Sequence, residues 1–355
     1  MCLVVLHHDR TSEFPLRVFE TRDENVYRPH GARALRLARG VDGPSYAEHW
    51  SAEESLRDVF LVHEDKREVM RAQPIGGFDR DRGTWIAVGG ETGVYARLLI
   101  ALFNDGSFAE SPTPEMQQLR QAQGYAKRGG VCLDAVAFPS ARACAEEFPA
   151  MTARAFARTG KKLMPYYVVV ADARDAFVLH LDEYATMHVT ELPQRELTMI
   201  SIRGINAPDS VMTRNLLAPM RETPLPHPAA ADGWDPWLRV ASVHGNFTDG
   251  WARDGAVPYL DPQWRSHQHS IIQPPYFNVP GTRNHARASA ESLQPGDIVE
   301  WTASSTCAAA ASDGGMLLLA DERLLEDDMP FPETVSAAPL PRRTSDYARI
   351  PLPRS

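Results

Sequence analysis

The chain has 355 residues, 43% of them hydrophobic and 23% charged, and its 46 acidic and 37 basic residues give a net charge of -9. This composition is typical of a globular protein with a buried core, and it excludes collagen-like, coiled-coil and disulfide-scaffold chains. The acidic balance argues against a nucleic-acid-binding protein, which normally carries a basic excess.

Apolar segments are too short for membrane insertion or secretion. The best apolar stretches, residues 98–103 and 166–171, fall far short of the ~20 residues that a bilayer requires, so we expect no membrane span. The apolar run at residues 2–6 is also shorter than a secretory apolar region of about 7–15 residues. No two of the four cysteines form a Cys-x-x-Cys pair. We therefore expect a cytoplasmic protein without disulfides.

The first third of the chain contains two predicted hairpins. Residues 2–6 and 14–19 are apolar or alternating segments joined by a polar turn, so residue 2 should lie near residues 20–24. Residues 50–75 are highly charged and predict exposed helix. Residues 84–88 and 94–103 then form a second pair of strands around a glycine-rich turn.

The middle of the chain changes from helix to strand. Residues 140–158 are rich in helix formers, with Ser140 as a cap, and Pro149 interrupts the pattern so that two short helices are allowed. Four short apolar segments follow at a spacing near ten residues and predict an antiparallel meander: 166–172, 176–181, 187–192 and 197–202. Strands, helices and strands in this order indicate an α+β protein rather than alternating βαβ units.

The last third of the chain is less periodic. We predict a single domain over residues 1–325, with a His- and Trp-rich insertion around 221–280 and late strands at 297–303 and 315–320. Residues 326–355 are proline-rich and predict a mobile tail. The tryptophans of the insertion suit either a pocket lining or core packing: Trp234, Trp237, Trp251 and Trp264.

Cys2 is the residue with the clearest chemical potential. Removal of the initiator methionine would leave a chain whose first residue carries both a thiol and an α-amine. That amine titrates near ~7.7–8.0 and can serve as a general base for the adjacent nucleophile. The alternative is that Cys2 is simply part of a buried first strand.

Arg22 and Asp23 follow the second predicted strand and fall beside Cys2 if the hairpin forms. The aspartate could hold the α-amine, while the arginine could lower the thiol pKa or bind a substrate carboxylate. The alternative interpretation of this charged segment is a solvated turn.

Several segments together resemble the transport and Golgi organisation 2 family, which is also named for its Asn-Arg-Asp-Glu motif. The match starts with Cys2 and the Thr-Arg-Asp-Glu segment at 21–24, in which threonine replaces the motif asparagine, and it covers roughly residues 1–285. Weaker matches keep the family order along the chain: 76–79, 83–88, 127–134, 205–207 and Gly281-Thr282-Arg283.

The resemblance implies an N-terminal-nucleophile hydrolase fold, a four-layer αββα sandwich of two antiparallel sheets flanked by helices. It implies that Cys2 attacks a small-molecule or short-peptide amide for hydrolysis or acyl transfer, with Arg22 and Asp23 positioning the thiol and amine. Asn206 would donate to the oxyanion, and Trp85 and Arg283 would contact the substrate. Without the resemblance, Asn206 suits a turn and Arg283 a surface position.

A non-catalytic carrier or chaperone of the same fold is the alternative function, because family members are implicated in haem trafficking. Haem or another hydrophobic cargo would then be the partner, and the histidines His244, His267, His269 and His285 are candidate ligands. No zinc-binding motif is present, so we predict no metal and no cofactor for the enzyme, and the sequence leaves its oligomeric state open.

Overall fold

The computed structural model describes fifteen segments of the chain: 3–25, 62–64, 75–78, 84–89, 98–104, 122, 124–126, 128–208, 210–230, 232–241, 276–278, 285–286, 298–312, 316–322 and 348–351. The predicted helix at 50–75 lies almost entirely outside them.

The larger sheet has nine antiparallel strands and is built around the first hairpin of the chain. Its main path runs β12–β11–β1–β2–β15–β13–β14, and β16 joins β15 to β17. The predicted hairpin at the N-terminal end is confirmed by β1 and β2. The strands are β1 (Leu3–His8), β2 (Leu16–Asn25), β11 (Leu197–Ser201), β12 (Gly204–Ile205), β13 (Tyr276–Asn278), β14 (His285–Ala286), β15 (Ile298–Ala310), β16 (Met316–Glu322) and β17 (Ala348–Pro351).

The second sheet has six antiparallel strands in the order β10–β9–β8–β5–β4–β3. It contains the second predicted hairpin, as β4 and β5. Its strands are β3 (Ile75–Phe78), β4 (Thr84–Gly89), β5 (Leu98–Asn104), β8 (Tyr166–Ala171), β9 (Ala176–Leu181) and β10 (Met187–Glu191). A separate parallel pair joins β6 (Tyr125–Ala126) to β7 (Lys162–Leu163).

The predicted four-strand meander holds for three strands and fails at the fourth. β8, β9 and β10 are consecutive neighbours, but β11 crosses to the larger sheet and pairs with β1. The crossing begins at Leu192, which is buried between the sheets, and the N–H of Arg195 donates to the carbonyl of His8 at 2.7 Å. Arg195 has a φ of 61°, a left-handed conformation that redirects the chain.

Two helices, α4 (Val131–Val136) and α5 (Ala141–Thr159), follow the short 3-10 turn Arg128–Gly130. The predicted cap is confirmed, because Ser140 Oγ accepts the N–H of Ala143 at 3.1 Å. The predicted break at Pro149 is wrong, since α5 runs through it. The neighbouring Phe148 is fully buried, and packing of this kind can hold a helix together across a missing N–H.

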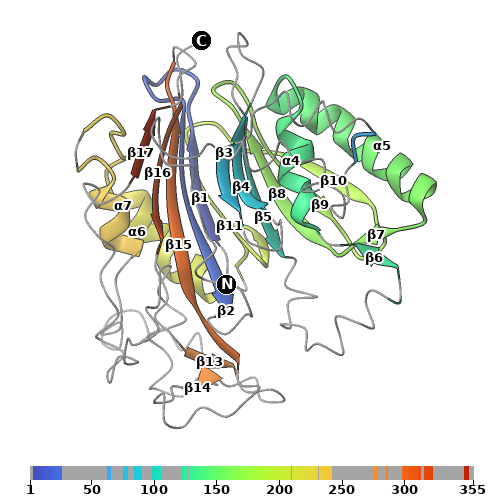
Figure 1. Ribbon diagram of the computed structural model, residues 1–355. Helices are drawn as coiled ribbons and strands as arrows, with labels where there is room; N and C mark the ends of the chain where they lie inside the picture. The colour runs from blue at the N-terminus through green and yellow to red at the C-terminus, as the bar shows by residue number, and fades with distance from the viewer. Residues whose placement is uncertain are drawn as a thin grey trace.

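The two sheets pack face to face, and side chains alternate along each strand between the two sides. Val4 and Leu6 of β1 meet Val169 and Val178 of the smaller sheet in the inter-sheet core. Figure 1 shows both sheets edge-on, with helices on the outer face of each. The predicted α+β organisation, with antiparallel sheets and helices, is confirmed.

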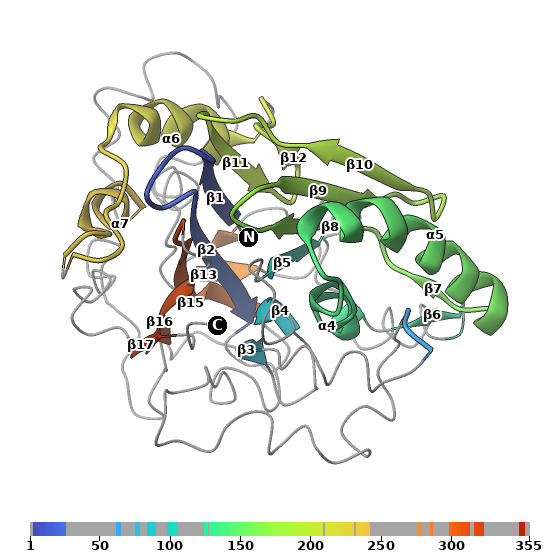
Figure 2. The ribbon, with the colours of Figure 1, turned by 90° about the horizontal axis from the view of Figure 1, so that it is seen from above.

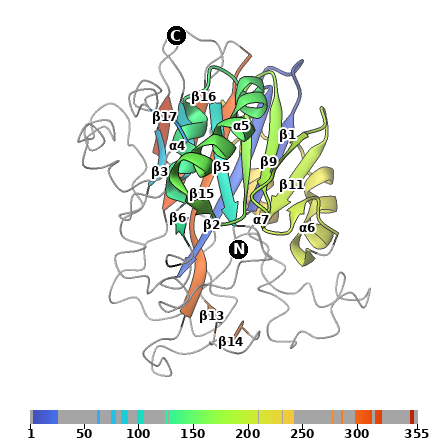
Figure 3. The same cartoon turned by 90° about the vertical axis from the view of Figure 1, so that its right-hand side faces the viewer.

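The outer faces carry two further cores. On the smaller sheet, Val168 and Val170 pack against α4 and α5 through residues that include Phe148. On the larger sheet, Leu3 and Val5 pack against α6 (Val211–Glu222) and α7 (Asp235–Ala241). Figure 2 shows the two helix pairs on opposite sides of the stacked sheets, and Figure 3 looks onto the smaller sheet with α4 and α5 in front.

Trp234 and Trp237 are core residues rather than pocket-lining residues. Both are 0% exposed, and their rings meet edge to face at 5.9 Å within the core beneath α6 and α7. The alternative of core packing is therefore correct for this pair, while Trp251 and Trp264 lie outside the described residues.

Part of the predicted mobile tail is ordered into the sheet. Residues 348–351 form β17, which pairs with β16 through Leu318 and Ile350, so the tail prediction is wrong for this segment. A proline at Pro351 is compatible with a strand that lies at the edge of the sheet.

Among the described residues, none of the helices has the length and hydropathy needed to cross a membrane.

Candidate functional site

The candidate site lies at the end of the sandwich where β1 begins. Leu3 is paired with Thr21 of β2 on one side and with Ser201 of β11 on the other. Cys2 itself lies outside the described residues. It is bonded to Leu3, and covalent geometry fixes neighbouring Cα atoms at about 3.8 Å. β1 is thus an interior strand whose first described residue has a neighbour on each side.

Arg22 and Asp23 lie within β2, which extends to Asn25, so the solvated-turn interpretation is wrong. Arg22 is opposite Ser304 and Asp23 is opposite Thr302 on β15, and the register shifts between these two pairs. The bulge leaves Ala303 as the extra residue. Bulges re-aim the side chains beside them and are frequent near active sites. The side chains of Arg22 and Asp23 lie outside the described part of the structure.

Glu20 is a candidate that the sequence reasoning missed. It pairs with Val4, an inter-sheet core residue, and is only 2% exposed. Two residues along a strand lie on the same face, so Glu20 follows Val18 on the inner face, two positions before Arg22. The available signal was the strand alternation itself, which places Val18 and Glu20 on one side.

Asn206 has a well-defined structural role. Its backbone N–H donates to the carbonyl of Met199 at 2.7 Å, and its side-chain Oδ1 accepts the N–H of Met199 at 2.8 Å. Its φ is 46°, a left-handed conformation that asparagine tolerates better than most residues. Because Oδ1 is committed to Met199, the Nδ2 donor group is held on the opposite side of the amide.

Of the remaining predicted site residues, one lies in the core and most of the others lie outside the described residues. Trp85 is 7% exposed and belongs to the inter-sheet core, where it packs with residues of both sheets. Arg283 lies outside the described residues, as do the haem-ligand candidates His244, His267 and His269. His285 is in β14.

The other cysteines are not competing nucleophiles. Cys132, Cys144 and Cys307 are buried, and none of the three is in a disulfide. Burial raises the pKa of the Cys132 thiol and of the Cys144 thiol well above the ordinary value, and nearby acidic groups act in the same direction. Since the thiolate is the reactive form, neither thiol is activated.

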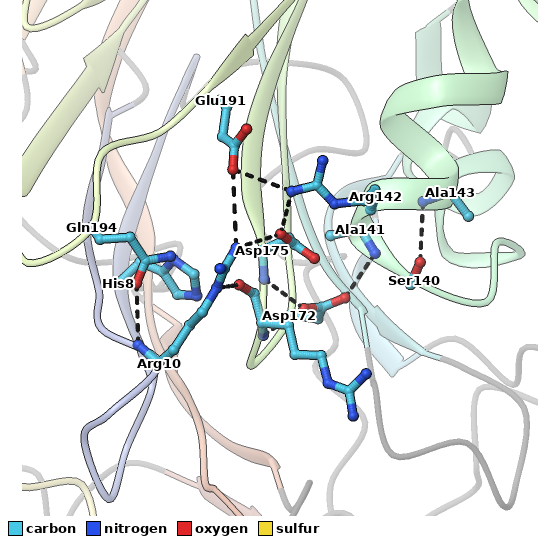
Figure 4. A network of polar contacts seen from close by, with 11 residues as sticks. His8, Arg10, Ser140, Ala141, Arg142, Ala143, Asp172, Asp175, Glu191 and Gln194 are labelled. Carbon is cyan, nitrogen blue, oxygen red and sulfur yellow. Dashed lines mark hydrogen bonds and ion pairs between the residues drawn. The ribbon is translucent and has the colours of Figure 1, made fainter.

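A polar cluster joins the two sheets at the opposite end of the sandwich (Figure 4). Asp175, in the β8–β9 turn, accepts hydrogen bonds from Arg10 at 2.7 Å and Arg142 at 2.6 Å. Arg10 follows β1 in the larger sheet, and Arg142 belongs to α5. Asp175 therefore ties one sheet to the other and to a helix. We call Arg10, Arg142 and Asp175 the clamp.

A second carboxylate organises the turn that carries the clamp. Asp172 is fully buried and accepts the N–H groups of Ala141, Arg174 and Asp175 at 2.7–2.9 Å. On the other sheet, Nε2 of Gln194 lies 3.1 Å from Nδ1 of the buried His8. Burial lowers the pKa of His8, so its neutral form is favoured. The clamp lies at the His8 end of β1, about 17 Å from Leu3 at the usual rise of ~3.4 Å per residue.

We expect Asp175→Ala to destabilise the protein by about 1–3 kcal/mol, because it removes hydrogen bonds to two charged partners at a largely buried position. Glu191→Gln is the matched control, because Glu191 contacts the same arginines but is exposed, and exposed pairs contribute only ~0.2–1 kcal/mol. Urea unfolding measures both, and equal losses would contradict a specific role for Asp175.

Within the described residues, no group of three or more His, Cys, Asp or Glu side chains is arranged to hold a metal ion. A surface hollow of about 500 Å³ lies between the end of α6 and the start of α7, on the far side of the larger sheet from the inter-sheet core. Its lining is Thr223, Pro224, Asp232, Asp235, Pro236 and Val240. The hollow is separate from the end of the sandwich where β1 begins.

Comparisons with known proteins give little further information. No protein-family model matches the chain. A search of curated proteins also finds no match. Among solved structures, the chain is similar to the Caenorhabditis elegans ortholog of N-acylethanolamine-hydrolyzing acid amidase, with 10% sequence identity and a TM-score of 0.30. The match covers 56% of this chain and 69% of the amidase chain.

Proposed function

We propose that the protein is an N-terminal-cysteine hydrolase of the transport and Golgi organisation 2 family, with the four-layer αββα sandwich of N-terminal-nucleophile enzymes. Cys2, freed by removal of Met1, is the nucleophile. The substrate is an amide of a small molecule or a short peptide, and the acyl group passes to water or to an acceptor amine.

The pairing of β1 with β2 is the observation that carries this proposal. Leu3, the first described residue of β1, lies opposite Thr21, which directly precedes Arg22 in β2. Alternation along β1 assigns Val4 to the inter-sheet face. The proposal extends this alternation by one residue, so that the Cys2 thiol faces the space between the sheets, near the bulge at Ala303.

The chemistry divides between a thiol and an amine on one residue. The thiol sulfur forms a bond to the amide carbon while its proton passes to the α-amine. The tetrahedral intermediate then breaks its C–N bond, and the ammonium returns the proton to the leaving nitrogen. Water attacks the resulting thioester, and the α-amine carries a water proton to the departing thiolate.

The negative charge that develops on the carbonyl oxygen is stabilised by a hydrogen-bond donor that is held in a fixed position. Asn206 is the candidate, since its Oδ1 is held by Met199 and its Nδ2 keeps two N–H groups for another partner. Arg22 favours the thiolate by its charge, and Asp23 holds the protonated amine.

Intact mass spectrometry tests the proposal. We expect a mass that lacks Met1, and we expect one equivalent of iodoacetamide at pH 7 to alkylate Cys2 before any other cysteine, because Cys132, Cys144 and Cys307 are buried. In denaturant, all four cysteines should react, which provides the control. Retention of Met1, or alkylation of Cys2 no faster than of the buried thiols, would overturn the proposal.

A further inference from the structure

A row of ring side chains crosses the inner face of the smaller sheet near the candidate site. Tyr167 of β8 pairs with His180 of β9, and His180 pairs with His188 of β10. The Tyr167 and His180 rings stack with centroids 4.1 Å apart and planes at 15°, and the His180 and His188 rings follow at 5.9 Å. We call these three residues the ring row.

The ring row lies at the same end of the sandwich as the start of β1. Alternation along β8 puts Tyr167 on the face of Val169, in the inter-sheet core, and Tyr167 packs against that core. A Cβ atom on Gly204 would come within 3.4 Å of the Tyr167 hydroxyl, so this ring reaches the β11–β12 turn. Gly204 pairs with Ser201, which pairs with Leu3, so the turn is two strand spacings, about 10 Å, from β1.

The row leads outward from the inter-sheet space to solvent. Tyr167 and His180 are half-buried, whereas the His188 side chain is 56% exposed. His188 is held in place because its Nε2 lies 2.7 Å from Oδ2 of Asp182. Oδ1 of Asp182 accepts the N–H groups of Tyr184 and Thr186, so this carboxylate is itself fixed by its turn. The outer end of the row is therefore preorganised.

Stacked rings turn their edges, not their faces, away from the sheet. The edges of the ring row carry a hydroxyl group and imidazole nitrogens, which are hydrogen-bonding groups. Arg203 lies beside Gly204 in the same turn, is exposed, and forms no ion pair with any residue in the described segments. Arg203 directly precedes Gly204, the residue that the Tyr167 ring approaches, so its exposed side chain starts at the inner end of the row. A guanidinium suits a carboxylate, which arginine binds through two parallel hydrogen bonds.

Resting on the proposed function, we infer that the ring row and Arg203 form a subsite for a carboxylate carried by the substrate, beside the β11–β12 turn and roughly 10 Å from β1. The substrate class is then an N-acyl amino acid or a short peptide with a free carboxyl end. The acyl carbonyl lies at Cys2, and the carboxylate lies on the side toward the β11–β12 turn, where the long Arg203 side chain reaches it.

Binding to a Cys2→Ala variant separates this inference from catalysis. The probes are hippurate, an N-acyl amino acid, and hippuramide, which has the same shape without the charge, titrated by calorimetry at pH 7. We expect hippurate to bind at least about tenfold more tightly, as a charge-assisted contact implies. Adding Arg203→Gln should reduce the preference to less than about twofold, while Arg154→Gln, which removes an exposed arginine of α5, should leave it unchanged.

A second pair of variants tests the ring row itself. Tyr167→Phe removes one hydroxyl from the row and should weaken hippurate binding about three- to tenfold. Tyr166→Phe removes a hydroxyl from the opposite, helix-covered face of the same strand and should have no effect on binding. Equal affinity for the two probes, no hippurate binding, or an Arg203→Gln variant that keeps the preference would overturn the inference. Because Cys2 is absent from every variant, these outcomes do not depend on whether the wild type hydrolyses amides.

Discussion

Replacement of Cys2 by alanine is expected to abolish amide hydrolysis while the protein remains folded. The proposed mechanism routes every bond change through the Cys2 sulfur, and losing a nucleophile of this kind lowers kcat by factors of about 10³ or more. The fold should tolerate the change, because the described cores are built from residues other than position 2. The measurement is hydrolysis of a panel of N-acyl amino acids and their amides, after the wild-type protein has been shown to cleave one of them.

Cys144→Ala is the matched control for this experiment. Cys144 is buried in the core beneath α5, and its thiol is held in the protonated form by burial. Its replacement should cost some stability, about 1 kcal/mol for a small change in the core, and leave kcat unchanged. Hydrolysis that survives in Cys2→Ala would contradict the nucleophile assignment. Loss of hydrolysis in Cys144→Ala at equal folded fraction would contradict it as well.

The local elements were predictable where the apolar pattern is strong. The hairpin of β1 and β2 follows from a buried run and an alternating run joined by a polar turn, and α5 follows from Ser140 and a series of helix formers. The sheet to which β11 belongs could not be predicted, because its apolar pattern fits either sheet equally well. The choice depends on contacts such as Arg195 with His8, which are distant along the chain.

The same limit applies to predicting the candidate site from the sequence. Cys2 and Arg22-Asp23 could be found because a hairpin brings nearby segments together. The ring row could not be found from the sequence. Tyr167, His180 and His188 are separated by 13 and 8 residues and meet only through the register of three strands. Pro149 was overinterpreted for a related reason, because local propensity omits the packing that supports α5 around Phe148.

The second prediction with a large expected effect concerns the pH dependence of stability, which depends on the buried carboxyl group of Asp134. This residue of α4 is buried, and its carboxyl oxygens accept the N–H groups of Val62 at 2.6 Å and His63 at 3.1 Å. Burial raises the pKa of Asp134 to about 8, although the two hydrogen bonds act in the opposite direction. The unfolded chain has the ordinary aspartate pKa near ~3.9.

Linkage fixes the sign of the effect. Below about pH 4, Asp134 is protonated in both states and its contribution to stability is complete. Between about pH 4 and 8 the unfolded chain loses this proton and the folded chain keeps it, so the free energy of unfolding falls by ~1.4 kcal/mol per pH unit. The total is of the order of 5 kcal/mol, and the dependence ends above about pH 8, where both states are ionised.

Asp134→Asn isolates this contribution because asparagine does not titrate. At pH 4 the wild type should be more stable, since the amide nitrogen of asparagine faces one of the two N–H groups and leaves it unpaired at a cost of about 1–3 kcal/mol. As the pH rises to 8, this difference should shrink and then reverse. Subtracting the two urea-unfolding profiles also removes the opposing contribution of His7 and His8, whose pKa values burial lowers in both proteins. A difference that stays constant from pH 5 to 8 would show that Asp134 is ionised in the folded protein and that its two backbone hydrogen bonds outweigh its burial.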